Sequence, residues 1–211
     1  NTAVADSVYI YKIAAEDIHG NISGMSNTAL IIIISTDIIV KIIPQGFYNT
    51  AKKLNMRDTV TAYLHSIISP YTVIDSAVTV IDSVSFSGTF KFLNTSTGNY
   101  YIVIKHRNSI ETWSKAGGEP IVSGTTSNYD FTDAVTKAFG NNLTLADTAP
   151  VRYSVFSGDI NQDGFIDLTD VILAYNDASS FVTGYKSSDV SGDNITDLTD
   201  IVIAYNNSVN F

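Results

Sequence analysis

The chain has 211 residues, of which 45% are hydrophobic and 16% charged, and it carries a formal net charge of −9 with no cysteine. This balance is typical of a globular chain rather than a disordered one, and it excludes disulfides and thiolate metal sites. The surplus of 21 acidic over 12 basic residues, without a basic stripe, argues against nucleic acid as a partner. Isoleucine, valine, threonine and tyrosine are frequent, so the composition predicts a mainly β fold.

Residues 1–36 contain two strand-like stretches, 7–17 and 27–34, on either side of a segment rich in turn-forming residues. Their apolar residues predict a hairpin-like pair. The sequence YIYKIAAEDIHGNISGMSN in this region resembles the last two strands of a fibronectin type III domain, which implies that residues 1–36 are part of such a domain. Because an isolated two-stranded hairpin is marginally stable in water, we expect these strands to need a further partner.

A long apolar run extends from Ala29 to Ile43. It is interrupted by polar or charged residues, namely Ser35, Thr36, Asp37 and Lys41. The run falls short of the roughly 20 continuous apolar residues that a membrane helix needs, so no membrane span is predicted. The first residue is asparagine and no secretion signal is evident, so we expect the chain to be a processed or excised portion.

Residues 37–156 are predicted to form a β-sandwich. Strand-like segments occur at 38–43, 58–66, 76–83, 84–94, 99–107 and 152–157. The turn-forming cluster 94–99 lies between two alternating strands and predicts a hairpin. That pair resembles hairpins of transthyretin-like and carboxypeptidase-regulatory-like sandwiches, which implies an immunoglobulin- or transthyretin-like sandwich and no activity. Short helices are expected at 47–56 and 131–140, the second capped by Thr132 and ended by Gly140.

The last quarter of the chain, residues 157–211, repeats one acidic pattern. Aligned from Asp159 and Asp189, nine of nineteen positions are identical. Residues 158–211 hold nine aspartates against a single lysine, so most of the net negative charge belongs to the repeat. A duplicated unit requires one physical explanation that serves both copies.

The first copy has the spacing of an EF-hand calcium loop, with Asp159 at position 1 and Gly164 at position 6. Calcium prefers six to eight hard oxygen ligands, and alternate residues of such a loop converge only if position 6 allows a sharp turn. The expected ligands are Asp159, Asn161, Asp163, the backbone carbonyl of Phe165, Asp167 and Asp170. A helix is expected over 167–178, and the residues expected on its buried face are Val171, Ile172, Ala174 and Tyr175.

The second copy repeats this register with small changes. The expected ligands are Asp189, Ser191, Asp193, the backbone carbonyl of Ile195, Asp197 and Asp200. Asn194 stands in place of glycine and tolerates the left-handed conformation better than most residues. Because Ser191 is a neutral ligand, we expect the second site to bind calcium less tightly than the first. The alternative explanation is that the aspartates only stabilise turns and cap helices.

Two calcium-loop and helix units thirty residues apart, following β modules, resemble a type I dockerin over residues 157–211. The resemblance implies two F-hand-like units packed antiparallel with two Ca²⁺ ions. It also implies an extracellular bacterial location and a cohesin partner that contacts the helix surfaces. Leu168-Thr169 and Leu198-Thr199 stand where dockerins of the cellulosome usually have Ser-Thr-like pairs, so the partner surface departs from that pattern.

No catalytic constellation is predicted, and we expect a protein that is not an enzyme. His19, His65 and His106 are far apart, lack metal-ligand spacing and are expected at turns or strand surfaces. Residues 105–107 are expected to end a strand in solvent. A glycosidase-like carboxylate pair stays open among five acidic residues, namely Glu16, Glu111, Glu119, Asp130 and Asp133.

A carbohydrate ligand also stays open but unsupported. Trp113 with Tyr100 and Tyr101 could form a sugar-stacking face, although a single tryptophan on a strand is more often part of a core or a sandwich rim.

Together these observations predict a non-catalytic extracellular calcium-binding protein: a β-sandwich with a small α-helical, EF-hand-like module that mediates or rigidifies protein–protein contacts. The expected partner is a cohesin-like protein or a second copy of the chain. One alternative is a surface-filament subunit that assembles by β-strand addition, giving a homo-oligomer or filament. A second alternative is the C-terminal end of a secreted glycan-degrading enzyme.

Overall fold

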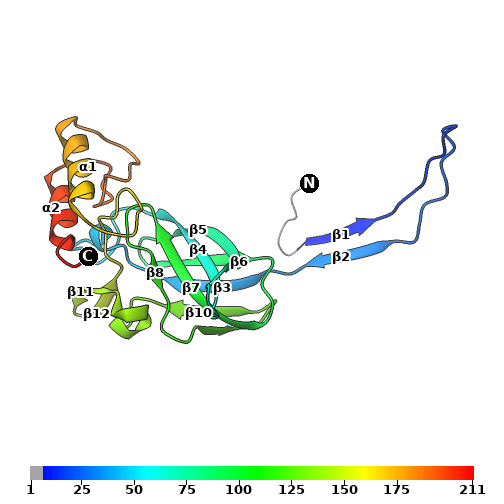
Figure 1. Cartoon of the computed structure of the whole chain (residues 1–211), viewed down its shortest axis with the longest axis horizontal. Coiled ribbons are helices and arrows are strands. Elements are labelled where there is room, and N and C mark those ends of the chain that lie inside the picture. The colour runs from blue at the N-terminus through cyan, green and yellow to red at the C-terminus, as the bar shows by residue number, and fades with distance from the viewer. Residues whose placement is uncertain (1–6) are drawn as a thin grey trace.

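The computed structural model describes residues 7–211, so residues 1–6 of the N-terminal region lie outside the described residues. The fold is mainly β, as predicted, with two helices near the C-terminus. The molecule is elongated: two strands project from one end, the helices lie at the opposite end, and the sandwich fills the middle (Figure 1). Among the described residues, no helix is long and apolar enough to cross a membrane.

The projecting strands are β1 (Ser7–Tyr11) and β2 (Ala29–Ile33), which pair antiparallel with Tyr9 opposite Ile31. The predicted hairpin-like pair is therefore confirmed. Its apolar side chains are exposed on both faces: Ile10 and Leu30, which are opposite each other, are more than half exposed on one face, and Tyr11 and Ile31 are each 50% exposed on the other. An apolar ribbon of two strands that stands away from the body has little of its own surface to bury.

The sandwich consists of two sheets. One has the order β10-β3-β6, formed by β3 (Thr36–Lys41), β6 (Ser87–Phe92) and β10 (Thr126–Asp130). The other has the order β5-β4-β7-β8, formed by β4 (Asp58–Ser66), β5 (Val73–Ile81), β7 (Gly98–His106) and β8 (Thr112–Trp113), and β9 (Glu119–Ile121) also pairs with β7. A separate hairpin joins β11 (Thr144–Thr148) to β12 (Val151–Ser154).

The main core lies between these sheets. Strand residues alternate between the two faces of a sheet, so every second side chain of a strand reaches the core. The buried set includes Ile38, Val40, Leu64, Phe90, Phe92, Ile102 and Ile104. Each is at most 1% exposed. The predicted β-sandwich is therefore confirmed.

The hairpin predicted across the turn cluster 94–99 is wrong. β6 pairs with β3, whereas β7 pairs with β4, so the cluster joins two sheets rather than two neighbouring strands. The alternation of each strand was interpreted correctly, but it places Phe90 and Ile104 on opposite layers of one core. The hairpin of this region is instead β4–β5, with Ala62 opposite Ala77.

The two short helices predicted within the sandwich are also wrong. Residues 47–56 contain only the end of a 3₁₀ turn, η1 (Gln45–Phe47), and residues 131–140 contain η2 (Val135–Lys137) and the start of η3 (Phe139–Asn141). Thr132 caps no helix, because its amide and hydroxyl both donate to Oδ1 of Asp130. Burial of Phe47 in the core outweighs the weak helical pattern of its neighbours.

The C-terminal module contains α1 (Leu168–Ser179) and α2 (Leu198–Asn207). Its core is small and is formed by Ile160, Ala174 and Val190, with Ile201 and Ile203 packed against it. The predicted buried face of α1 is only partly correct: Ala174 is buried, but Ile172 and Tyr175 are 48% and 59% exposed. A core of this size needs support from elsewhere, as is usual for very small domains.

Candidate metal centre

The two loops that precede the helices have the same hydrogen-bond framework. At position 1, Oδ2 of Asp159 accepts the amide of Gly164 at 3.3 Å, and Oδ2 of Asp189 accepts that of Asn194 at 3.2 Å. The acceptor and donor are positions 1 and 6 in both copies. Gly164 and Asn194 both have positive φ, 92° and 71°, which closes the turn that the spacing predicted.

The carboxylate at position 12 closes each loop from the other side. Oδ1 of Asp170 accepts the amides of Ile160 and Asn161 at 2.7 and 3.1 Å, and Oδ1 of Asp200 accepts the amide of Ser191 at 2.7 Å. Both side chains are fully buried. Each loop therefore folds back on the first turn of its own helix.

The aspartates at position 9 cap the helices. Oδ1 of Asp167 accepts the amide of Thr169, and Oδ1 of Asp197 accepts that of Thr199, both at 2.7 Å. Each forms a capping box with the aspartate three residues later. These two aspartates thus have the turn-and-cap role that the alternative explanation gave to all of them.

The expected ligands divide into a buried and an exposed group. The buried group is Asp159, Asp170, Asp189, Ser191 and Asp200. The exposed group is Asn161, Asp163, Phe165, Asp167, Asp193, Ile195 and Asp197. Within residues 7–211, no cluster of three or more His, Cys, Asp or Glu side chains is close enough to hold a metal as it stands. Coordination in these loops would also require the amide, hydroxyl and carbonyl oxygens of the set, and exposed side chains turned inward.

One buried carboxylate oxygen of the two loops has no hydrogen bond. Asp159 is 2% exposed, and its Oδ1 has no hydrogen bond. Burial, followed by the negative charge of Asp170, raises the pKa of Asp159 to about 6. Burial also raises the pKa of Asp200. An unpaired buried oxygen beside a second carboxylate is unfavourable without a cation, so these residues fit a divalent ion such as Ca²⁺.

The position-1 aspartate of the second loop has a partner from the sandwich. Arg107, which follows β7, donates from Nη2 to Oδ2 of Asp189 at 3.2 Å and from Nε to Oδ2 of Asp58 at 2.7 Å. The guanidinium also lies over the ring of Tyr185, 4.4 Å from its centroid, and the Tyr185 hydroxyl donates to Asp58. Arg107 thus joins the sandwich to the second loop, and the prediction that residues 105–107 turn into solvent is wrong.

Further contacts fix the module against the sandwich. Nδ2 of Asn108 donates to the carbonyl of Asp189 at 2.8 Å, and Nδ2 of Asn207 donates to Oε1 of Gln45 at 2.6 Å. At Gly192 a Cβ atom would lie 2.6 Å from the ring of Phe47, so only glycine permits this approach. Polar and steric complementarity of this kind indicates a fixed junction rather than a flexible linker.

A buried Ser–His–Asp series lies behind Arg107. Nδ1 of His106 is 3.0 Å from Oγ of Ser109, and Nε2 is 3.1 Å from Oδ2 of Asp58. Its members are at most 3% exposed, so a substrate has no access and the connectivity is structural. Burial lowers the pKa of His106. Burial alone would raise the pKa of Asp58, but the hydrogen bond and charge of His106, with the Arg107 and Tyr185 hydrogen bonds, hold it well below its usual range.

His106 was expected at a strand surface, and that expectation is wrong. The other two histidines match it: His19 lies exposed in a turn, and His65 lies partly exposed on β4. Four of the five acidic residues considered for a carboxylate pair have other partners. Glu119, Asp130 and Asp133 form ion pairs with lysines, and Glu111 accepts the indole N–H of Trp113.

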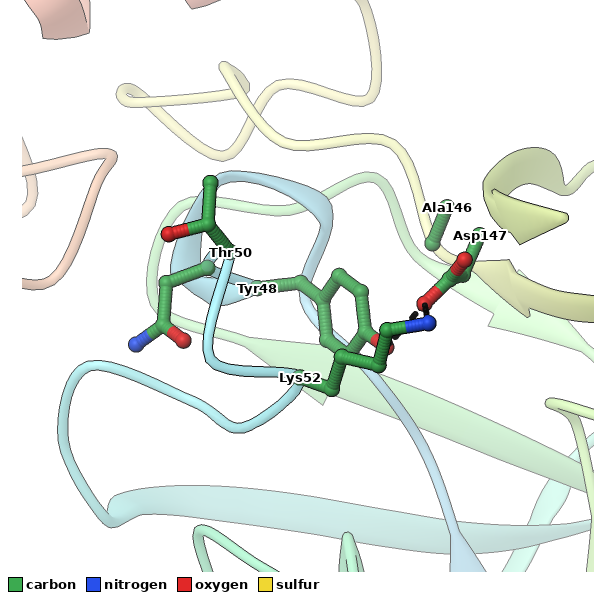
Figure 2. A pocket seen from close by; sticks show the side chains of 6 residues that line it. Tyr48, Thr50, Lys52, Ala146 and Asp147 are labelled. Atoms are coloured by element: carbon green, nitrogen blue, oxygen red, sulfur yellow. Dashed lines mark hydrogen bonds and ion pairs between the residues drawn. The ribbon is translucent and has the colours of Figure 1, made fainter. Parts of the chain in front are cut away.

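A polar pocket beside the loop after η1 has a structural explanation as well. Figure 2 shows the hydroxyl of Tyr48 and the ammonium of Lys52 both directed at the carboxylate of Asp147, at 2.8 and 3.2 Å. The backbone amide of Ala149, followed by the Tyr48 hydroxyl, lowers the pKa of Asp147. The contact fastens residues 48–52 to β11 and contains no activated nucleophile.

A scan against protein-family models and a search of curated proteins find no match. Two solved structures that resemble the chain are interface mutants of a type II cohesin–X-dockerin complex from Acetivibrio cellulolyticus. The first shares 17% identity over 83% of this chain and 99% of that chain, with a TM-score of 0.46. The second shares 15% identity over the same proportions, with a TM-score of 0.44. At this low level of agreement the likeness says nothing about function.

Proposed function

We propose that the C-terminal module binds two calcium ions, one in each loop, and that the ions order its helices as a surface for a protein partner. The observation that carries the calcium proposal is the buried Oδ1 of Asp159, which has no hydrogen bond and lies beside a second carboxylate. The charge balance of residues 158–211 supports the same proposal. Nine aspartates stand against one lysine there, and two Ca²⁺ ions would add four positive charges beside these carboxylates.

The proposed ligands are the two sets of residues predicted from the sequence, one set in each loop. The first ion is held by Asp159, Asn161, Asp163, the carbonyl of Phe165, Asp167 and Asp170. The second is held by Asp189, Ser191, Asp193, the carbonyl of Ile195, Asp197 and Asp200. The second site is the weaker one, because Ser191 is neutral and because Arg107 already occupies one oxygen of Asp189.

The partner surface is the exposed apolar face of the two helices. Equivalent positions of the repeat are exposed to a similar degree: Leu168 and Leu198 are 68% and 70% exposed, and Tyr175 and Tyr205 are 59% and 61% exposed. Ile172 and Val202 form a third such pair. Apolar side chains that recur uncovered in both copies favour recognition by another protein. A cohesin-like β-sandwich is the partner that we propose, outside a bacterial cell where calcium is plentiful.

Calorimetric titration of the chelated protein with Ca²⁺ tests the metal. We expect two ions per chain, and saturating calcium should stabilise the fold by about 2.7 kcal/mol per site at a hundredfold excess over Kd. Unchanged melting with calcium and with chelator would overturn the proposal. The D159N variant should leave one ion, and Y48F, which removes only a hydroxyl bonded to Asp147 of β11, should leave two.

The partner surface is tested separately on the calcium-loaded protein. Purified cohesins are titrated onto the wild type and onto L168S, L198S and the double variant. Because the faces are duplicated, each single change should weaken binding moderately and the double change should abolish it. Equal, undiminished binding by the double variant would show that the helices are not the contact.

A second candidate function, self-assembly by strand addition, is favoured by β1 and β2. These strands project from the body with Val8, Ile10 and Leu30 exposed (Figure 1). Strand addition would extend this two-stranded sheet with a strand of a second copy. Sedimentation and electron microscopy should reveal oligomers or fibres that V8K and I10K together remove, and monomers at high concentration would exclude this function.

A further inference from the structure

A half-open aromatic pocket lies on the sandwich, away from both loops. Tyr71, Tyr101, Trp113 and Phe139 line it, and it encloses about 300 Å³. The volume is at the lower end of the range for small-molecule sites. Tyr101 is on the outer face of its sheet, because it alternates along β7 with the core residue Ile102.

The four rings come from separate segments and contact one another. The ring centroid of Tyr101 lies 5.5 Å from that of Trp113 and 6.1 Å from that of Phe139, and that of Tyr71 lies 6.3 Å from that of Trp113. The series continues across the sheet to His65, whose ring lies 4.6 Å from that of Trp113. Separate elements therefore converge to build one aromatic surface.

Hydrogen bonds hold this surface in place. The indole N–H of Trp113 donates to Oε1 of Glu111 at 2.8 Å, and Nδ1 of His65 is 2.8 Å from the carbonyl of Tyr71. The hydroxyl of Tyr129 accepts the amide of Lys115 at 3.1 Å and donates to the carbonyl of Lys137 at 2.5 Å, which ties the segment after β8 to the turn before Phe139. The pocket is thus preorganised before any ligand arrives.

The rim of the pocket leaves aromatic surface in water. Tyr71 and Phe139 are 46% and 51% exposed, although Tyr101 beneath them is almost buried. Side chains of this size lower the free energy most when they are covered, so their exposure around a preformed hollow indicates a ligand.

We propose that this pocket binds a glycan by stacking one pyranose ring against the aromatic side chains. The four lining residues are uncharged, so they suit a neutral ligand. The pocket is open, so the ligand needs an apolar face for the rings and polar groups that stay hydrated on the open side. A pyranose has both: C–H groups on its faces and hydroxyls around its edge. The phenol groups of Tyr71 and Tyr101 can bond those hydroxyls.

The single tryptophan of the chain makes the test specific, since Trp113 is the only indole fluorophore. Soluble β-1,4-linked hexasaccharides of glucose, xylose and mannose are titrated onto the full chain in calcium. We expect a saturable change in tryptophan emission with at least one of them. The Y71A and F139A variants should each weaken binding at least tenfold, because their rings form the rim and the indole reporter is retained.

The matched control is Y205A, which removes a similarly exposed tyrosine from α2 and should bind the sugar as the wild type does. Melting curves establish that all variants fold, which is expected for rings so far exposed. No saturable signal with any of the three sugars would overturn the proposal. So would binding that Y71A and F139A leave unchanged.

Discussion

The two loops of the C-terminal module are near-copies in sequence but differ in their surroundings. Both fold with the same two bonds: the amide of position 6 donates to the carboxylate of position 1, and the amide of position 3 donates to that of position 12. Asp159 nevertheless has a buried oxygen without a partner, whereas Asp189 is bonded to Arg107 of the sandwich. Position 4 differs as well: Gln162 donates to the carbonyl of Ser109, and Gly192 packs against Phe47.

Two loops of nearly the same sequence therefore have different contacts, because each packs against a different part of the same β-sandwich. The module has an internal repeat, but the sandwich beside it has none, so only one loop can receive Arg107. In the second loop the positive side chain of Arg107 already compensates part of the carboxylate charge and fixes Asp189 in place. Among the described residues no ion pair joins a basic side chain to Asp159, although Lys105 lines the same pocket, so the stability of the first loop is expected to depend more strongly on calcium.

The largest effect is expected when the position-1 aspartates are replaced in chelator. D189N leaves Arg107 with a reduced set of partners in a buried site and should lower the free energy of unfolding by about 3 kcal/mol. D159N removes a buried charge that has no cation and should raise the free energy of unfolding by roughly 1–2 kcal/mol. Urea unfolding in chelator at pH 7.5 measures both.

The two variants distinguish the loops because their expected changes in the free energy of unfolding in chelator have opposite signs. In saturating calcium both should destabilise, because each then removes a ligand. If D159N and D189N shift the chelated protein in the same direction, the loops are equivalent and Arg107 does not distinguish them.

The next effect concerns close packing at position 4. In G192A the new methyl group would meet Phe47 at 2.6 Å, and the residue has φ of 70°, so a loss of about 2 kcal/mol is expected. Q162A at the same position of the first loop removes the hydrogen bonds from Nε2 to the carbonyls of Asp159 and Ser109, at 2.7 and 3.3 Å, and should cost about 1 kcal/mol. Thermal melting of both variants in calcium provides the comparison, and equal losses would contradict it.

A smaller effect is expected on calcium affinity. R107M removes one positive charge next to Asp189, so the second site should bind calcium about tenfold more tightly, which corresponds to about 1.4 kcal/mol. R107K keeps the charge and should change the affinity much less. R152M is the control, since Arg152 stacks on Phe86 in the sandwich and removing it changes the net charge equally. An unchanged second affinity in R107M would show that Arg107 does not compete with the ion.

Much of this comparison could be predicted from sequence, and the missing part has a clear physical reason. The shared hydrogen-bond framework of the loops, the capping aspartates and the turn at Gly164 depend on neighbours within a dozen residues, so local spacing indicates them. The contact of Arg107 with Asp189 spans 82 positions, and the stack of Phe47 on Gly192 spans the whole sandwich. The β6–β7 error has the same origin: alternation gives the face of a strand but not its sheet.

The smallest expected effect is on pH dependence and isolates Asp159. Its folded pKa is about 6 against an ordinary 3.8, so the folded state takes up a proton before the unfolded chain does. The resulting stability is complete below pH 3.8 and is lost as pH rises through 6. In chelator, when the pH is lowered from 7.5 to 5, the free energy of unfolding of the wild type should therefore rise by about 1 kcal/mol relative to that of D159N.

The comparison with D159N is needed because His106 acts in the opposite direction in the same interval. Burial lowers the pKa of His106, so its contribution to stability is lost as pH falls. That loss is common to wild type and D159N and cancels in their difference. D189N should be less stable than the wild type by a constant amount. Its free energy of unfolding should depend on pH as that of the wild type does, because Asp159 is intact. A difference between wild type and D159N that stays constant with pH would mean that Asp159 is not the unpaired carboxylate on which the first calcium site depends.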